Sequence, residues 1–316
     1  MDKIKKNAEV AVIESYRQSE AIAARKHPHL YRVASLFPER DRYLAFCAAY
    51  ASMRWIDDRV DDDISSLAEL ENWEKEIKSA FRGESGSNIY GPALAETFRR
   101  FELPLEPWEK LAGAMKFDLQ HSGFESYDLF LDYAEGATVA PAAIFASLLL
   151  QRPEGDRFRL PLPYDEIRKA VRNAAIVCYE VHILRDARED LAAGRNYFPR
   201  DELAAFQLAD PNALLSDWKE YLSIYGARTR HRQKRALIDL EAIEVFMTSR
   251  EKLMLHLLIE FYIYSLDKMN RLEFDIWSDR HALDRDEMTN IVTTLYKKYD
   301  SSPASPSFVL EGSEDV

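Results

Sequence analysis

Helical periodicity runs through most of this 316-residue chain and restricts its fold more than any other feature. Apolar side chains recur at three- and four-residue spacing in long segments, and clear strand alternation is absent. With only 10 Gly and 13 Pro, the composition favours long helices over many-stranded sheets. We therefore expect an all-α fold. The expected helices cover residues 2–25, 38–61, 66–81, 92–101, 107–121, 126–150, 163–190, 212–225, 232–271 (in which a break is allowed for) and 284–299.

No linker divides the chain, so one domain is expected over residues 1–300. Residues 301–316 are acidic and rich in Ser and Pro, which predicts a disordered tail. A chain of this length can bury a large core and still enclose a cavity.

The formal charge of −12 disfavours nucleic acid and, on average, anionic lipid as partners, although a local basic pocket remains compatible with it. Residues 1–11 carry no secretory signal. The longest apolar stretch, 139–150, is shorter than the roughly 20 residues of a membrane span. A cytoplasmic location is the default expectation. Cys47 and Cys178 lack metal-ligand spacing and are expected to be buried, reduced thiols.

The first unusual feature is an acidic cluster at residues 57–63, directly after an apolar helical stretch. Asp57 and Asp61 are four residues apart, so on a helix their carboxylates share one face. Two like charges at this spacing repel unless a cation lies between them.

The same arrangement recurs at Asp186 and Asp190, again after an apolar stretch. If the two helices packed together, four carboxylates would meet, a donor set suited to Mg²⁺ and to diphosphate substrates. The alternative is a solvated acidic helix end. An Arg precedes each cluster, Arg54 and Arg185, either as a bidentate phosphate ligand or as a salt-bridge partner. The repetition favours a functional site.

Residues 54–61 resemble the first aspartate-rich motif of squalene and phytoene synthases, and residues 182–199 resemble the second. The second segment is the more specific part, because it contains the pairs Arg-Asp, Glu-Asp and Gly-Arg and the triplet Tyr-Phe-Pro. The resemblance extends from about residue 27 to 267. It implies an isoprenoid-synthase fold, a single helical bundle around a central prenyl cavity.

The resemblance also implies a reaction: two farnesyl or geranylgeranyl diphosphates are joined head to head, through a cyclopropyl diphosphate, to a C30 or C40 product. Its implied metal ligands are Asp57, Asp61, Asp186 and Asp190, binding Mg²⁺ with Mn²⁺ as the alternative. No dinucleotide motif is visible, so NADPH is not predicted.

Other site residues follow from the same resemblance. Arg54 and Arg185 would contact diphosphate, Tyr50 and Tyr262 match cavity tyrosines, and His27 falls near a diphosphate-contacting histidine. The chain departs from the family pattern at His182, at Tyr179 and at Glu135, which stand where the family usually has Asn, Gln and Tyr. These departures motivate a second hypothesis, a class I terpene cyclase-like enzyme acting on one prenyl diphosphate. A third is a non-catalytic helical scaffold.

Tyr179 and Glu135 are expected to contact substrate, and His182 and Glu135 keep two interpretations each. His182 would donate to diphosphate or accept a proton from a carbocation, or it would orient a nearby carboxylate. Glu135 would be a base with a raised pKa, or a partner of an Arg. The basic run 228–235 is either a solvated helix face or a patch for lipid or diphosphate entry. Apolar substrates imply peripheral membrane contact, and the sequence does not indicate an oligomeric state.

Overall fold

The structure is a computed structural model that describes residues 2–61, 66–121, 123–192, 194–208, 215–275 and 282–299. Side chains are described from residue 7 onward, except those of residues 61, 215 and 216. The tail expected to be disordered, 301–316, lies outside the described residues.

The all-α expectation is confirmed, and one β-hairpin is added to it. The helices are α1 (Asp2–Lys26), α2 (Pro28–Ala34), α3 (Arg40–Asp61), α4 (Leu67–Phe81), α5 (Gly91–Arg100), α6 (Glu106–Gln120), α7 (Tyr127–Ala134), the π-helix η1 (Glu135–Val139), α8 (Ala140–Leu150), α9 (Tyr164–Ala192), α10 (Arg200–Ala205), α11 (Leu215–Glu244), α12 (Ser249–Arg271) and α13 (Arg285–Tyr299). The hairpin consists of β1 (Arg152–Glu154) and β2 (Arg157–Arg159), which pair antiparallel and are too short to show strand alternation in the sequence.

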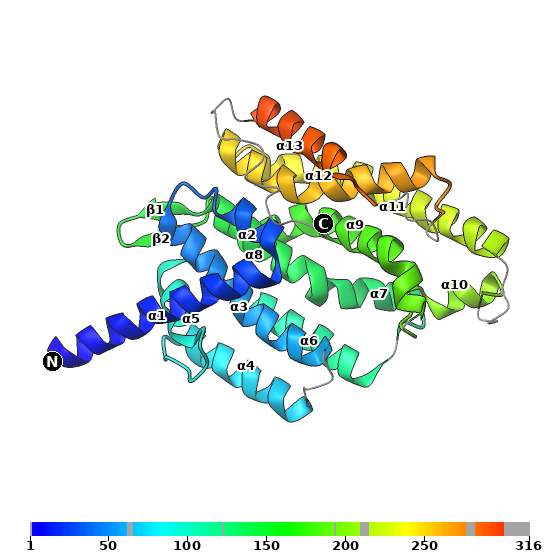
Figure 1. Cartoon of the computed structure of the whole chain (residues 1–316). Coiled ribbons are helices and arrows are strands. Elements are labelled where there is room, and N and C mark those ends of the chain that lie inside the picture. Colours follow the sequence, from blue (N-terminus) through cyan, green and yellow to red (C-terminus); the bar gives the residue numbers. More distant parts are fainter. Residues whose placement is uncertain are drawn as a thin grey trace.

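The helices surround one continuous hydrophobic core. Figure 1 shows α11, α12 and α13 along one side of the molecule, α1, α4, α5 and α6 along the other, and α8 and α9 between them. α9 packs along α11 and also contacts α8, η1 and α12. This central helix therefore carries the second acidic cluster through the middle of the protein.

The break expected within 232–271 is present, but the gap expected before it is not. α11 continues from Leu215 to Glu244, and Thr248 starts α12 with a capping box that it forms with Glu251. Gly226, inside α11, does not end the helix. Its missing Cβ leaves the space that the ring of Phe274 occupies, so this glycine serves packing rather than termination.

The expected helix 126–150 is continuous but contains the π-helical turn η1. Gly136 lies in this turn, where a Cβ would collide with the Lys110 carbonyl oxygen of α6. The stretch Tyr127–Leu150 is long and apolar enough to cross a membrane, with a mean hydropathy of 1.4, which the sequence did not lead us to expect. Because 72% of its most apolar 18-residue stretch is buried inside the protein, it is a core helix of this fold.

Candidate active site

A largely apolar cavity of about 380 Å³ lies between α2, α3, η1, α8, α9, α11 and α12. This volume falls within the roughly 300–1,000 Å³ typical of small-molecule sites. Its apolar walls include Leu30, Phe46, Ala49, Met53, Ala137, Pro141, Ala142, Ile144, Phe145, Val171, Ala174, Ala175, Leu240, Leu255, Leu258 and Ile259. The structure thus contains the kind of central cavity that the sequence comparison implied.

One face of α9 forms the longest wall. Its cavity residues recur every three or four positions from Val171 through Ala174 and Cys178 to Arg185, as one helix face requires. Arg185 follows Val171 by 14 residues, so at 1.5 Å per residue this wall is about 21 Å long. Small side chains in its middle leave room for an extended apolar chain. The wall changes from apolar to charged at its C-terminal end.

The charged end is built around Asp186. Arg185 donates from Nε to Asp186 Oδ1 at 2.7 Å, and its Nη2 lies 2.7 Å from His182 Nε2. His182 Nε2 is also 2.9 Å from Asp186 Oδ2. Partial burial favours the neutral acid, but the hydrogen bonds from His182 and Arg185 outweigh it and hold the pKa of Asp186 well below its usual range.

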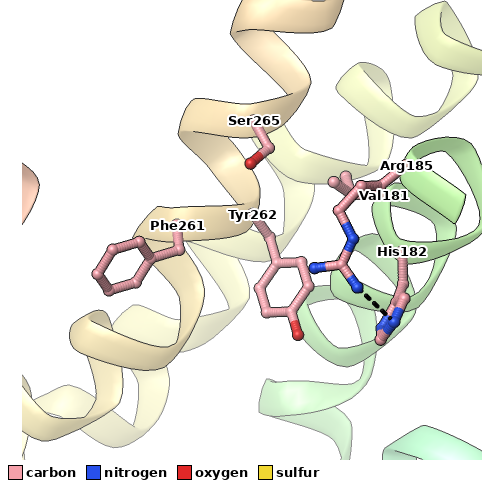
Figure 2. A pocket seen from close by; sticks show the side chains of 6 residues that line it. All are labelled: Val181, His182, Arg185, Phe261, Tyr262 and Ser265. Carbon is pink, nitrogen blue, oxygen red and sulfur yellow. Dashed lines mark hydrogen bonds between the residues drawn. The ribbon is translucent and has the colours of Figure 1, made fainter. Parts of the chain in front are cut away.

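Tyr262 of α12 faces this cluster across the cavity. Figure 2 shows its ring beside the Arg185 guanidinium and the His182 ring. The centroids of the Tyr262 and His182 rings are 6.4 Å apart. Burial raises the pKa of Tyr262 to about 12, so its hydroxyl stays protonated at neutral pH. On α3, Tyr50 also lines the cavity and stacks on Phe46, with centroids 5.9 Å apart. Burial raises the pKa of Tyr50 too.

The first acidic cluster is held by basic side chains. Arg54 places Nη1 2.6 Å from Asp57 Oδ2 and Nε 2.5 Å from Asp58 Oδ1. Lys26 of α1 also binds Asp58, at 2.6 Å. Asp61 ends α3, but its side chain lies outside the described residues. In the second cluster, Asp190 pairs with Arg195 at 2.9 Å.

His27, at the junction of α1 and α2, connects the two clusters. Its side chain lines the cavity, and desolvation by the surrounding protein lowers the pKa of His27 to about 4. The next contributions come from His29, His182 and Arg54. His27 lines the cavity together with Tyr50 and Met53 of α3 and with His182 and Arg185 of α9. The two acidic helix ends therefore flank one mouth.

Two expected substrate ligands lie outside the cavity lining. Tyr179 packs among aromatic rings, with its centroid 5.9 Å from Phe130 and 6.2 Å from Tyr133. Glu135 accepts a 2.7 Å hydrogen bond from Arg168 Nη1 and a second bond from Arg172 Nε. The arginine-pairing interpretation of Glu135 thus has a structural counterpart.

Some lining residues were not identified from the sequence. His29, Leu30, Met53 and Thr138 all face the cavity. Leu30 and Met53 fit the helical core pattern, so nothing in the sequence separates them from packing residues. Thr138 lies in the π-helical turn, where its Oγ1 is 3.3 Å from the Ala175 carbonyl oxygen. A π-turn shifts the register of the wall, which periodicity cannot foresee.

The carboxylate oxygens at the mouth are the kind of ligand that a hard divalent cation prefers. Within the described part of the chain, where the Asp61 carboxylate is not included, no three His, Cys, Asp or Glu side chains form a group that could hold a metal. Mg²⁺ is commonly held by one or two carboxylates, with water and substrate phosphate as its other ligands. Asp57 and Asp186, about one-third exposed at the mouth, fit that mode.

Comparison with known proteins agrees with this architecture. The family model for squalene/phytoene synthase matches residues 24–287. Phytoene synthase 1, chloroplastic, of Solanum lycopersicum is 21% identical over 288 residues, covering 90% of this chain and 68% of that protein. Phytoene synthase of Arthrospira platensis is 26% identical over 280 residues, covering 84% and 87%.

Solved structures show the same fold. A dehydrosqualene synthase in complex with ligand superposes with a TM-score of 0.75 at 15% identity, covering 92% of this chain and 98% of that one. Squalene synthase HpnC from Alicyclobacillus acidocaldarius gives a TM-score of 0.68 at 21% identity, covering 84% and 96%. The resemblance noted in the two aspartate-rich segments is confirmed. The chain belongs to the squalene/phytoene synthase family.

Proposed function

We propose that this protein is a prenyltransferase that joins two allylic prenyl diphosphates head to head, through a cyclopropyl diphosphate, to a C30 or C40 product. The observation that carries the proposal is the cavity itself, an apolar chamber that ends at His182 and Arg185, beside Asp186 on α9, and at Met53, one helical turn before Asp57 on α3. This polarity matches the substrate class, which has an apolar chain and an anionic head.

The arginines at the mouth would hold the diphosphate. Arg54 and Arg185 now pair with acidic neighbours on their own helices, and both are about 30% exposed. A diphosphate oxygen can take the place of a carboxylate oxygen on a guanidinium with the same bidentate geometry. We propose that Asp57, Asp61, Asp186 and Asp190 would hold a divalent cation, Mg²⁺ or Mn²⁺, whose chemistry there would be to neutralise charge on the leaving diphosphate.

The cavity would protect the allylic cation. Its apolar walls exclude water, which would otherwise capture the cation, and the faces of Phe46, Tyr50 and Tyr262 stabilise positive charge. The second prenyl chain, held in the same chamber, would supply its double bond to the cation left when the C–O bond of the first diphosphate breaks. Loss of one proton, to the released diphosphate or to His182, would then close the cyclopropane ring. Because the neutral hydroxyls of Tyr50 and Tyr262 stay protonated, they act as donors rather than bases.

His182 has two roles open to it at the mouth. Its Nε2 lies between Arg185 and Asp186, so it orients the carboxylate in the absence of substrate. His182 also lines the cavity, where it would contact diphosphate or accept a proton.

The test is an incubation of the purified protein with Mg²⁺ and farnesyl or geranylgeranyl diphosphate, each with and without NADPH, followed by mass analysis of extracted products. We expect a C30 or C40 product or the cyclopropyl diphosphate, abolished by chelation and restored by Mg²⁺. Replacing Asp186 with Asn should lower turnover by about 10²–10³-fold. A cyclic C15 or C20 product would instead identify a cyclase, which the family membership does not favour.

A further inference from the structure

Exposed apolar side chains are concentrated on α11. Of the eleven large hydrophobic side chains exposed within the described residues, five belong to α11 or to the turn that follows it. These are Ile224, Leu237, Ile238, Val245 and Phe246, with Val245 75% and Ile238 57% exposed. The other six are distributed over α1, α4, α7 and the segment before α5. Such a concentration is typical of a surface that meets an apolar partner.

Three of these residues form one stripe. Ile224, Ile238 and Val245 occupy positions separated by multiples of seven, or about two helical turns. Within α11 the stripe runs from Ile224 to Ile238, about 21 Å at 1.5 Å per residue, and Val245 follows directly after the last helical residue, Glu244. The opposite side of α11 is buried, with Leu240 and Ile243 fully covered, so the helix is held by its inner face. We call the stripe, together with His231, Lys234 and Arg235, the α11 outer face.

Basic side chains interrupt the stripe. His231, at the remaining position of the seven-residue series, and Lys234 and Arg235 near it are exposed. Arg235 pairs with Asp239 while two-thirds exposed, and Lys234 has no ion pair within the described residues. Glu220 and Glu241 also lie on this side of the helix, toward its two ends. In a chain of net charge −12, the middle of the outer face is a local basic site among apolar side chains.

We propose that the α11 outer face docks on the surface of an anionic lipid bilayer. Apolar side chains on a helix that lies in the interface enter the boundary between headgroups and acyl chains, and Lys and Arg beside them attract anionic headgroups. A second copy of this chain fits less well. A two-fold contact centred on the stripe would place Lys234 and Arg235 against their own copies, and like charges repel.

The docking face adjoins the cavity through the same helix. Leu240, two residues after Ile238, lines the cavity from the inner side of α11. The proposed surface is therefore the outer side of a cavity wall. The proposal rests on exposure and charge alone and does not depend on the reaction, so failure of either can be recognised separately.

The experiment is co-sedimentation of the full chain with vesicles of phosphatidylcholine, with and without phosphatidylglycerol. Wild-type protein should bind the anionic vesicles, less as salt rises. The double variant Ile238→Ser, Val245→Ser should lower the partition coefficient by roughly tenfold or more, and Lys234→Glu by roughly fivefold. The matched control Ile89→Ser, Leu129→Ser removes two apolar side chains that are 46% and 42% exposed elsewhere, and should bind like wild type.

All variants alter exposed side chains, so their thermal unfolding midpoints should stay near that of wild type, which removes misfolding as an explanation. The proposal is overturned if wild-type protein leaves anionic vesicles unbound, or if the control loses as much binding as the α11 variant. It is equally overturned if size-exclusion chromatography with light scattering shows a dimer that Ile238→Ser, Val245→Ser dissociates while vesicle binding is unaffected.

Discussion

Arg42 of α3 donates a 2.6 Å hydrogen bond from Nη1 to Oε1 of Glu251 of α12, and the side chains are only 2% and 1% exposed. The same nitrogen donates to the Leu149 carbonyl of α8 at 2.8 Å. Each of these three residues lies one helical turn, four positions, from a residue that lines the cavity: Arg42 from Phe46, Glu251 from Leu255, and Leu149 from Phe145. Through its ion pair and its carbonyl hydrogen bond, Arg42 therefore joins three of the helices that form the cavity's apolar walls.

Replacing Arg42 with Met should destabilise the protein strongly. Glu251 would keep Arg152, whose Nη2 lies 2.8 Å from Oε2, but would lose its most buried partner. Removing one partner of a buried pair costs about 3–5 kcal/mol, and the remaining arginine places our expectation near the lower value. Urea unfolding measures it. As a control, Arg99→Met breaks exposed pairs with Glu96 and Asp156 and should cost about 1 kcal/mol or less.

Acidification should weaken the same pair. Burial favours the neutral form of Glu251, but hydrogen bonds from the Thr248 backbone, Arg42 and Arg152 together lower its pKa. The unfolded chain, with a glutamate pKa of about 4.3, then binds the proton more readily than the native protein does. This stabilisation is present above that pH and is lost as pH falls through the native pKa.

The measurement is the free energy of unfolding of wild type and of Glu251→Gln at a series of pH values from neutral to about 3. The variant should be less stable at neutral pH and should lose less on acidification, so that the two curves converge. Parallel curves would show that Glu251 does not titrate differently in the native state.

Gly136→Ala tests whether packing or helix propensity dominates in the π-turn. Propensity alone would stabilise an Ala by up to about 1 kcal/mol. The new Cβ would, however, collide with the Lys110 carbonyl oxygen, a backbone atom that cannot rotate away. Because α6 and η1 must then separate, we expect a net loss of about 1–3 kcal/mol. Thermal unfolding decides the sign, and a stabilised variant would contradict the close packing of α6 against η1. The exposed Gly113→Ala in α6, with open space around its Cβ, should be neutral or stabilising.

The helices were predictable because each buries one apolar face, and the 3.6-residue period records it. The acidic clusters were visible because charge after an apolar stretch is unusual. Pairings between distant residues were not visible: Arg42 and Glu251 are 209 positions apart, and either alone reads as an ordinary surface charge. The continuity of α11 through Gly226 depends on the ring of Phe274, a tertiary contact. Local patterns thus located the charged mouth better than the walls of the cavity.

Glu135→Gln separates the two interpretations of this departure from the family pattern. Its carboxylate binds Arg168 and Arg172 of α9 and is not part of the cavity lining. Neutralising Glu135 should cost about 1–3 kcal/mol of stability, because two partly buried arginines lose their anion. Product formation should stay within about threefold of wild type, because the cavity lining is unchanged. The matched variant Arg172→Gln should destabilise similarly, and the double variant should show coupling of about 0.5–3 kcal/mol. A large loss of turnover in Glu135→Gln, with the free energy of unfolding unchanged, would favour the catalytic interpretation. If Glu135 acted only through its ion pairs, a loss of turnover would come with a loss of stability.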